Sequence, residues 1–253
     1  MLCSTRTLDT NANRAAALSY FSNPGNFSDP ETRELAKILW ELEWTMPSGP
    51  YLDRAANRQR HIEVLKVLSQ TDDKTDRLLH LLNHVEYEEG GDEHVLFRVD
   101  SEPGRIFKAT FGDNFGCRSN FDRLDPELTG KHFNATGNED STYYFRRWVI
   151  LNALGGFKTR FEGILPPEQP HWLPRICISQ PWLDGGNPGE EIISKAMTYA
   201  GFREISRGAF FLEEAGVLLT DAAPRNVRIM EGRAIPFDAI AELVEDEVVR
   251  WIK

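Results

Sequence analysis

The sequence predicts an α+β protein in which a helical N-terminal segment, residues 1–85, precedes a region rich in short strands, residues 86–253. Two observations predict this division. Apolar residues recur at helical spacing in three stretches before residue 85. After Glu86 this spacing gives way to short β-branched and aromatic runs, which are separated by turns rich in Gly, Pro and Asn.

The N-terminal helices are expected over residues 30–46, 54–68 and 74–85, where Leu, Ile and Val recur every three or four positions. The first of them follows Asp29, a residue type that caps helices, and has Pro30 in its first turn. The first 85 residues are therefore interpreted as a helical segment.

The next region begins with a predicted antiparallel hairpin, in which strands 94–99 and 105–110 are joined by a Ser-Glu-Pro-Gly turn. Residues 111–140 are rich in Gly, Asn and Asp, so a long irregular loop is expected there. A helix over residues 141–154 follows, with Gly155-Gly156 as its stop.

The rest of the chain is predicted to alternate short strands with helices. Strands are expected over residues 161–165, 175–179, 216–220, 227–230 and 234–237. Helices are expected over residues 188–199 and 241–252.

Charge and composition disfavour several classes of function. The 39 Asp and Glu residues exceed the 29 Lys and Arg residues, so the formal charge is −10 and nucleic acid is not the expected partner. No apolar run approaches the roughly 20 residues of a membrane span, and the first residues lack an apolar signal core, so no membrane partner and a cytoplasmic location are expected. Cys3, Cys117 and Cys177 are far apart and are interpreted as free thiols.

The segment with the clearest chemistry runs from residue 217 to residue 238. An apolar strand ends at Asp221, Asn226 follows five positions later, and a hairpin with Glu231-Gly232 at its turn leads to Asp238. These three oxygen-bearing side chains are expected at one end of a small sheet. Phosphoryl transfer needs such an arrangement, because oxygen ligands must hold Mg²⁺ against nucleotide phosphates while a separate carboxylate orients the attacking hydroxyl.

This D-x-x-x-x-N pattern, followed by a hairpin and a second Asp, resembles the protein-kinase-like fold. Arg105-Ile106-Phe107-Lys108 lies where that fold carries its phosphate-binding Lys, and residues 176–182 resemble the strand that enters its hinge. The run is most similar to the Ser/Thr/Tyr-kinase-like domains of phage and mobile-element polyvalent proteins. The resemblance covers roughly residues 86–242.

The resemblance implies a two-lobed fold, with a small β lobe over residues 86–181 and a reduced C-terminal lobe over residues 182–253, and it implies ATP and Mg²⁺ as cofactors. Asp221 would be the catalytic carboxylate, and Asn226 and Asp238 would hold the metal.

The same resemblance implies the nucleotide contacts. Lys108 would act with Asp221 in catalysis by holding the phosphates, and the turn at Gly90 and Gly91 would cover them. The hinge residues Gln180, Trp182 and Leu183 would bind the base. Because Pro181 has no N–H, the backbone donor would come from Trp182 or Leu183.

The chain also departs from the kinase pattern. Leu219 replaces the His two positions before Asp221, and Asp238 is followed by Ala-Ile rather than Phe-Gly. The helix over residues 141–154 contains no Glu to pair with Lys108, which leaves Glu139 and Glu162 as candidates. Only 15 residues follow Asp238, so the large helical lobe that binds peptide substrates is not expected.

The leading prediction is an ATP- and Mg²⁺-dependent phosphotransferase that acts on a hydroxyl of an unknown protein or small molecule. One alternative is a pseudokinase that binds nucleotide without turnover, and another is an interaction protein that uses helices 30–85. Lys108 by itself could be an exposed strand residue, but it alternates with Ile106 and would then share a buried face, where a Lys needs an anionic partner. Arg225 and Arg228 are interpreted as surface charges, and His80 and His84 as helix residues rather than a metal site.

Overall fold

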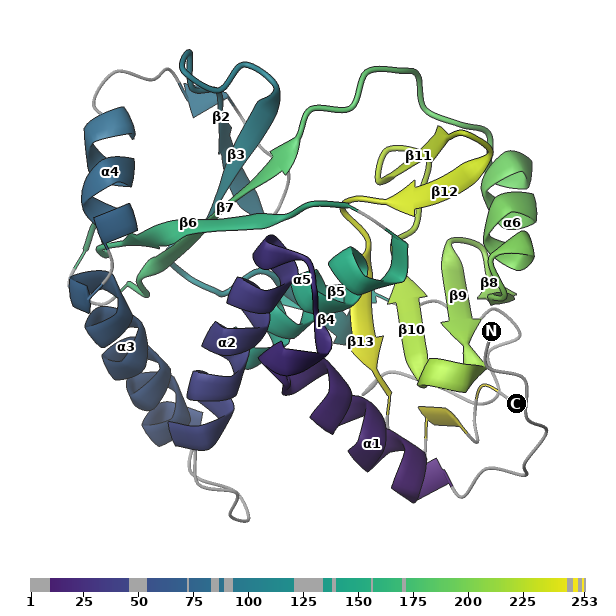
Figure 1. The fold of residues 1–253 in the computed structure, drawn as a ribbon, viewed down its shortest axis with the longest axis horizontal. Helices are drawn as coiled ribbons and strands as arrows, with labels where there is room; N and C mark the ends of the chain where they lie inside the picture. The colour runs from purple at the N-terminus through teal and green to yellow at the C-terminus, as the bar shows by residue number, and fades with distance from the viewer. Residues whose placement is uncertain are drawn as a thin grey trace.

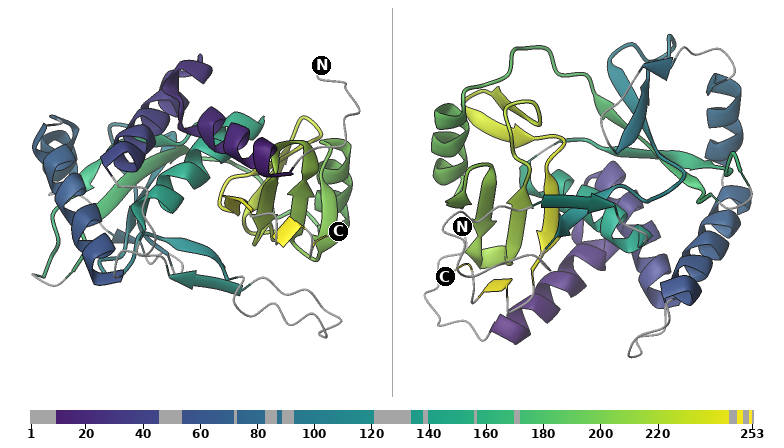
Figure 2. Two further views of the ribbon diagram at one scale, coloured as in Figure 1. Left: turned by 90° about the horizontal axis from the view of Figure 1, so that it is seen from below. Right: turned by 180° about the vertical axis from the view of Figure 1, so that it is seen from behind.

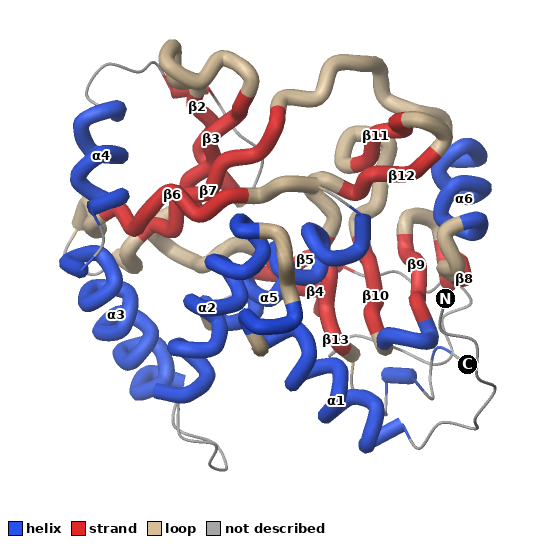
Figure 3. Tube along the Cα trace, in the orientation of Figure 1, coloured by secondary structure: helices blue, strands red, loops and turns tan. Residues whose placement is uncertain are grey.

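The structure is a computed structural model, which describes residues 10–45, 54–71, 73–82, 87–88, 93–120, 134–137, 140–155, 157–169, 172–244, 248–249 and 252. Within these ranges the chain is α+β, and its sheets are antiparallel (Figure 1 and Figure 3).

The helices are α1 (Thr10–Ser22), α2 (Pro30–Thr45), α3 (Arg54–Thr71), α4 (Asp73–Leu82), α5 (Ser141–Gly155) and α6 (Glu190–Tyr199), with the short 3-10 helices η1 (Pro24–Asn26) and η2 (Glu213–Ala215). The predicted helices over residues 30–46, 54–68, 74–85, 141–154 and 188–199 are confirmed, with small shifts at their ends, over the residues that the structure describes, and residues 46 and 83–85 lie outside these. Helix α1 was not predicted. At the start of α2, Asp29 Oδ2 accepts the Thr32 N–H at 2.9 Å, so Asp29 is the expected helix cap.

The larger sheet has the strand order β1-β2-β3-β7-β6. Its strands are β1 (Tyr87–Glu88), β2 (His94–Phe97), β3 (Arg105–Thr110), β6 (Arg160–Leu165) and β7 (Arg175–Pro181). The predicted β2–β3 hairpin is confirmed, and β7 pairs with the other edge of β3, so that Leu96, Lys108 and Ile178 lie side by side across the sheet. Lys108 is therefore at the centre of the sheet.

A second sheet of four strands has the order β13-β10-β9-β8. Its strands are β8 (Arg203–Ser206), β9 (Ala209–Leu212), β10 (Val217–Thr220) and β13 (Ile240–Leu243). The chain between β10 and β13 forms a separate hairpin of β11 (Val227–Met230) and β12 (Arg233–Pro236), which lies above β10 and beside α6 in Figure 1. The strands predicted over residues 216–220, 227–230 and 234–237 are thus confirmed, while the β8–β9 hairpin was not predicted.

Two sequence predictions are wrong. The predicted loop over residues 111–140 contains an antiparallel pair, β4 (Cys117–Asn120) with β5 (Asn134–Gly137). The predicted final helix over residues 241–252 is wrong at its start, which is strand β13, because each residue of Ile240–Leu243 pairs with β10 and all four are buried. Pairing with a buried neighbouring strand outweighs the helical spacing of the apolar residues there. Val248, Val249 and Ile252, which the structure also describes, are helical as predicted.

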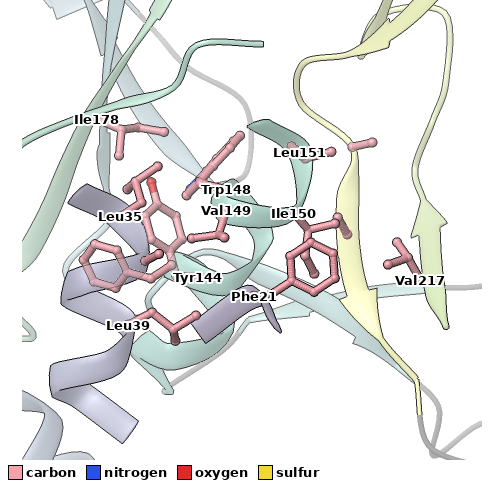
Figure 4. Packing of buried hydrophobic residues seen from close by; sticks show 14 of the residues in the cluster. Phe21, Leu35, Leu39, Tyr144, Trp148, Val149, Ile150, Leu151, Ile178 and Val217 are labelled. Carbon is pink, nitrogen blue, oxygen red and sulfur yellow. The ribbon is translucent and has the colours of Figure 1, made fainter. Parts of the chain in front are cut away.

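Helix α5 is the centre of the hydrophobic core (Figure 4). Trp148 is fully buried, and Leu35 and Leu39 of α2 belong to the same cluster, as do Ile178 of β7 and Val217 of β10. Figure 2 shows α1 and α2 along one side of the molecule, where both contact α5. One core therefore joins the N-terminal helices to both sheets.

Among the described residues, no helix combines the length and the apolar character that crossing a bilayer requires.

Candidate functional site

Asp221 and Asp238 lie at the same edge of the four-stranded sheet. Strand β10 ends at Thr220 and strand β13 begins at Ile240, and these two residues are partners in the antiparallel register. Asp221 follows the first strand and Asp238 precedes the second, so the pairing of the strands brings the two residues to one place, as the sequence predicts.

The loop after β10 is held together by Asn226. Its Nδ2 donates to the Asp221 carbonyl at 2.8 Å and to Asp221 Oδ2 at 2.7 Å. Its own carbonyl accepts the N–H groups of Phe237 at 3.0 Å and Asp238 at 3.3 Å. Asn226 thus connects both aspartates, although the resemblance implies only a metal ligand at this position.

Asp221 has a constrained backbone and a partly buried carboxylate. Its φ is +51°, which is unusual for a residue other than Gly. Arg225 Nη2 donates to its Oδ1 at 2.7 Å, so Arg225, interpreted from sequence as a surface charge, also contacts the site. Burial raises the pKa of Asp221, and the positive charge of Arg225 offsets part of that rise.

Lys108 has a buried side chain, and its Nζ lies 2.7 Å from Asp238 Oδ1. The expectation that Lys108 lies on a buried face with an anionic partner is confirmed, and the partner is Asp238. Glu162 instead accepts hydrogen bonds from Arg160 and Ser179, and Glu139 lies outside the described residues. Glu162 therefore does not take the place of the Glu that the 141–154 helix lacks as a partner for Lys108.

Sequence reasoning missed Arg147, which occupies the face of α5 that points to the site. Its side chain is 2% exposed, and it donates from Nη2 to the Asp238 carbonyl and from Nε to the Ala239 carbonyl, both at 2.9 Å. It also forms an ion pair with Glu93, and its Nη2 lies 3.7 Å from Asp238 Oδ1. The available signal was an Arg within the aromatic run Tyr-Tyr-Phe-Arg-Arg-Trp, where a buried cation requires partners.

Glu93 and His94 complete this buried cluster. Glu93 Oε1 accepts the Cys117 N–H at 2.8 Å, and His94 Nε2 lies 2.9 Å from the Tyr144 hydroxyl. Metal-ligating atoms of Glu93, His94 and Asp238 lie within 4.8 Å of one another. The positive charges of Lys108 and Arg147 lie among the same groups.

The electrostatics of the cluster keep its carboxylates charged. Burial raises the pKa of Asp238, but the charges of Lys108 and Arg147 outweigh this effect and hold it at about 2. Burial lowers the pKa of His94 to about 4, so this imidazole is neutral near neutral pH. The two buried cations, Lys108 and Arg147, therefore balance the two partly buried carboxylates, Glu93 and Asp238.

The predicted hinge residues lie at the end of β7 but differ in what they contact. Gln180 is fully buried, and its Nε2 donates to Phe237 O at 2.9 Å and to Thr159 Oγ1 at 3.1 Å, so it supports the segment that carries Asp238. The Trp182 N–H donates to the Gly104 carbonyl at 2.8 Å, which leaves Leu183 as the backbone donor of the two predicted. Gly90 and Gly91 lie outside the described residues.

A cavity of about 490 Å³ lies on the other side of Asp221. Helix α6, the β8–β9 hairpin and the loop after β10 line it, and Asp221 is part of its wall. The hairpin is tied to the loop, because the Ala222 N–H donates to the Gly208 carbonyl at 2.9 Å. Asp221 thus borders a space large enough for a small molecule.

Comparisons of the chain with models of protein families, with curated proteins and with solved structures give no match.

Proposed function

We propose that the protein is an ATP- and Mg²⁺-dependent phosphotransferase of the protein-kinase-like kind. The observation that carries the proposal is the 2.7 Å contact between Lys108 Nζ and Asp238 Oδ1, residues that are 130 positions apart. In protein kinases the phosphate-binding Lys is on the third strand, and a catalytic-loop Asp and Asn precede a metal-binding Asp. Lys108 of β3, Asp221, Asn226 and Asp238 follow this order.

The arrangement of the sheets supports a two-lobed interpretation. The five-stranded sheet with α5 would be the small β lobe over residues 86–181. The four-stranded sheet, the β11–β12 hairpin and α6 would be the reduced C-terminal lobe over residues 182–253.

The side chains fit Mg²⁺, which prefers oxygen ligands. Asp238 offers an ionised carboxylate. The amide nitrogen of Asn226 donates to Asp221, so its amide oxygen is the atom that can act as a ligand. Bound Mg²⁺ would neutralise charge on the nucleotide phosphates.

Asp221 would act as the base. It accepts the proton of the acceptor hydroxyl while that oxygen bonds the γ-phosphorus of ATP, the bond to the β,γ-bridging oxygen breaks, and ADP leaves with the electron pair. A carboxylate whose pKa is raised accepts this proton more readily than an ordinary one, and burial raises the pKa of Asp221.

Lys108 would exchange partners on nucleotide binding. Lys108 pairs with Asp238 in this structure, and with nucleotide bound it would turn to the phosphates, which would leave the Asp238 carboxylate available to hold Mg²⁺. Arg147 would keep Asp238 in place through the exchange, because it holds the backbone carbonyl of that residue.

A second candidate function is nucleotide binding without turnover. Active protein kinases pair the strand Lys with a Glu of the neighbouring helix. Here α5 contributes Arg147, and two cations already surround Asp238. The absence of the activating Glu from the described residues of α5 favours this second function.

Thermal unfolding with ATP and Mg²⁺ tests the proposal. A ligand present at about 100 times its dissociation constant adds about 2.7 kcal/mol of stability, which raises Tm by several degrees. We expect a rise that needs both ATP and Mg²⁺, disappears in Asp238→Asn and persists in the control Asp100→Asn, an exposed carboxylate. No rise in the wild-type protein would overturn the proposal.

Release of ADP separates the two candidate functions. With an acceptor present, the enzyme predicts turnover that Asp221→Asn abolishes while the ATP-dependent rise in Tm remains. The pseudokinase predicts the same rise in Tm with no ADP release from the wild-type protein.

A further inference from the structure

The cavity beside Asp221, here called the α6 cavity, has an apolar floor and a polar rim. Ile193, Ala209, Phe210 and Ala222 are all at most 2% exposed and contribute to its lining. Polar groups of α6 and of the β8–β9 hairpin surround this floor. An apolar base with a few polar groups at defined positions is typical of a small-molecule site, and about 490 Å³ is within the usual range of such sites.

The charges that line the cavity are mostly negative. The lining carboxylates are Glu190, Glu191, Glu204 and Asp221, and Arg207 is the lining cation. Outside the lining, Lys195 pairs with Glu191 and Arg225 pairs with Asp221. Arg207 forms an ion pair with Glu190, which satisfies that carboxylate. Glu204 differs from Glu190, because the donor that holds it is the neutral hydroxyl of Ser194.

Glu204, which is exposed, is therefore the carboxylate of the described lining that a neutral group holds. A cationic group on a ligand would form a charge-assisted hydrogen bond with this carboxylate, which is stronger than a bond between neutral groups. An anionic ligand would be repelled by the same residue.

We propose that the α6 cavity binds the phosphate acceptor, and that this acceptor is a small compound that carries both a hydroxyl and an amine, with its reacting hydroxyl at Asp221 and its ammonium group at Glu204. This inference rests on the proposed phosphotransferase function and names its substrate class. The size of the cavity favours a small molecule over an extended peptide.

The test uses three sugars that differ in charge: D-glucosamine, D-glucose and D-glucuronate. Binding to the full chain is measured by ligand-observed NMR titration at slightly acidic pH, where the amine is protonated. We expect glucosamine to bind about tenfold more tightly than glucose, and glucuronate to bind most weakly. Equal binding of the three sugars, or binding of none of them, would overturn the acceptor class.

Two matched variants locate the effect. Glu204→Gln keeps the shape of the side chain and removes its charge, so it should bring glucosamine and glucose to the same affinity. Glu214→Gln, an exposed carboxylate outside the cavity lining, should leave the preference for glucosamine unchanged. A preference that survives in Glu204→Gln would overturn the role of Glu204.

The same samples report on the proposed function independently. The rise in Tm with ATP and Mg²⁺ depends on Lys108 and Asp238, neither of which lines the cavity. A rise in Tm without sugar discrimination overturns the acceptor inference and leaves the phosphotransferase standing. Sugar discrimination without a rise in Tm overturns the phosphotransferase and, with it, the acceptor role of the cavity.

Discussion

Arg147 holds Asp238 by its backbone rather than by its carboxylate alone. Its Nη2 donates to the Asp238 carbonyl at 2.9 Å, while its distance to Asp238 Oδ1 is 3.7 Å. The carboxylate remains closest to Lys108, at 2.7 Å. Helix α5 therefore fixes the position of Asp238, the candidate metal ligand, and strand β3 supplies Lys108, the cation that the Asp238 carboxylate contacts.

The Lys108–Asp238 pair should show strong thermodynamic coupling. Lys108→Met leaves a mostly buried carboxylate without its nearest cation and should lower the free energy of unfolding by about 3 kcal/mol. Adding Asp238→Asn to this variant should restore part of the loss, with a coupling energy of about 1–3 kcal/mol. Chemical denaturation of the wild-type protein, both single variants and the double variant measures this; strictly additive losses would contradict the pairing.

Asp238 should make the protein sensitive to acid. Its pKa is about 2 in the folded protein against an ordinary value of 3.8, so its stabilising effect is complete above about pH 4 and is lost as the pH falls through 2. Between about pH 5 and about pH 3 the wild-type protein should lose about 1 kcal/mol more stability than Asp238→Asn. Urea unfolding of both proteins at the two pH values checks this, and parallel losses would show that another group causes the acid sensitivity.

Arg147 should be essential for folding stability. Arg147→Met leaves the mostly buried Glu93 carboxylate without its cation and two backbone carbonyls without their Arg147 donor, so we expect a loss of about 3–5 kcal/mol. Arg147→Lys retains the charge but not the planar fork and should recover only part of the loss. The exposed Arg233→Met on β12 is the control, and its unfolding midpoint in urea should stay near that of the wild-type protein.

Glu242 of β13 should lower the free energy of unfolding as the pH rises. Burial raises its pKa to about 7 from 4.5, and the Ser119 N–H, at 2.6 Å, offsets part of that rise. Between these values the folded protein binds a proton that the unfolded chain does not, so stability falls as the pH rises and then levels off. Glu242→Gln should match the wild-type protein near about pH 4 and exceed it by up to about 3 kcal/mol near about pH 8. Denaturation curves at both pH values test this, and a constant difference would exclude titration of Glu242 as the cause.

The sequence predicts the order of the candidate site residues along the chain, because the patterns that mark these residues are local. The strand before Asp221, the turn at Glu231-Gly232 and the alternation around Lys108 each lie within a few residues, and strand pairing then brings the segments together. The partnership of Arg147 with Glu93 joins residues 54 positions apart and has no such local signal.

Other elements were mispredicted because tertiary contacts outweigh local patterns. The acidic then apolar stretch over residues 241–252 suits a helix, yet pairing with β10 makes residues 240–243 a strand. Trp182 follows a hinge-like Gln-Pro, yet its N–H is taken by the Gly104 carbonyl in the neighbouring turn. Neither partner can be identified from the residues adjacent in sequence.

The β11–β12 hairpin leaves the four-stranded sheet after β10 and returns to it at β13, and the register between these two strands fixes both points. Thr220 and Ile240 are paired, so the spacing between Asp221 and Asp238 is set by interstrand hydrogen bonds and not by the length of chain that connects them. At the tip of the hairpin, Glu231 and Gly232 both have positive φ, as a two-residue turn of this kind requires. Residues inserted at that tip would lengthen the connection while the two carboxylates kept their positions, which makes the tip the natural place to attach a reporter group to a working site.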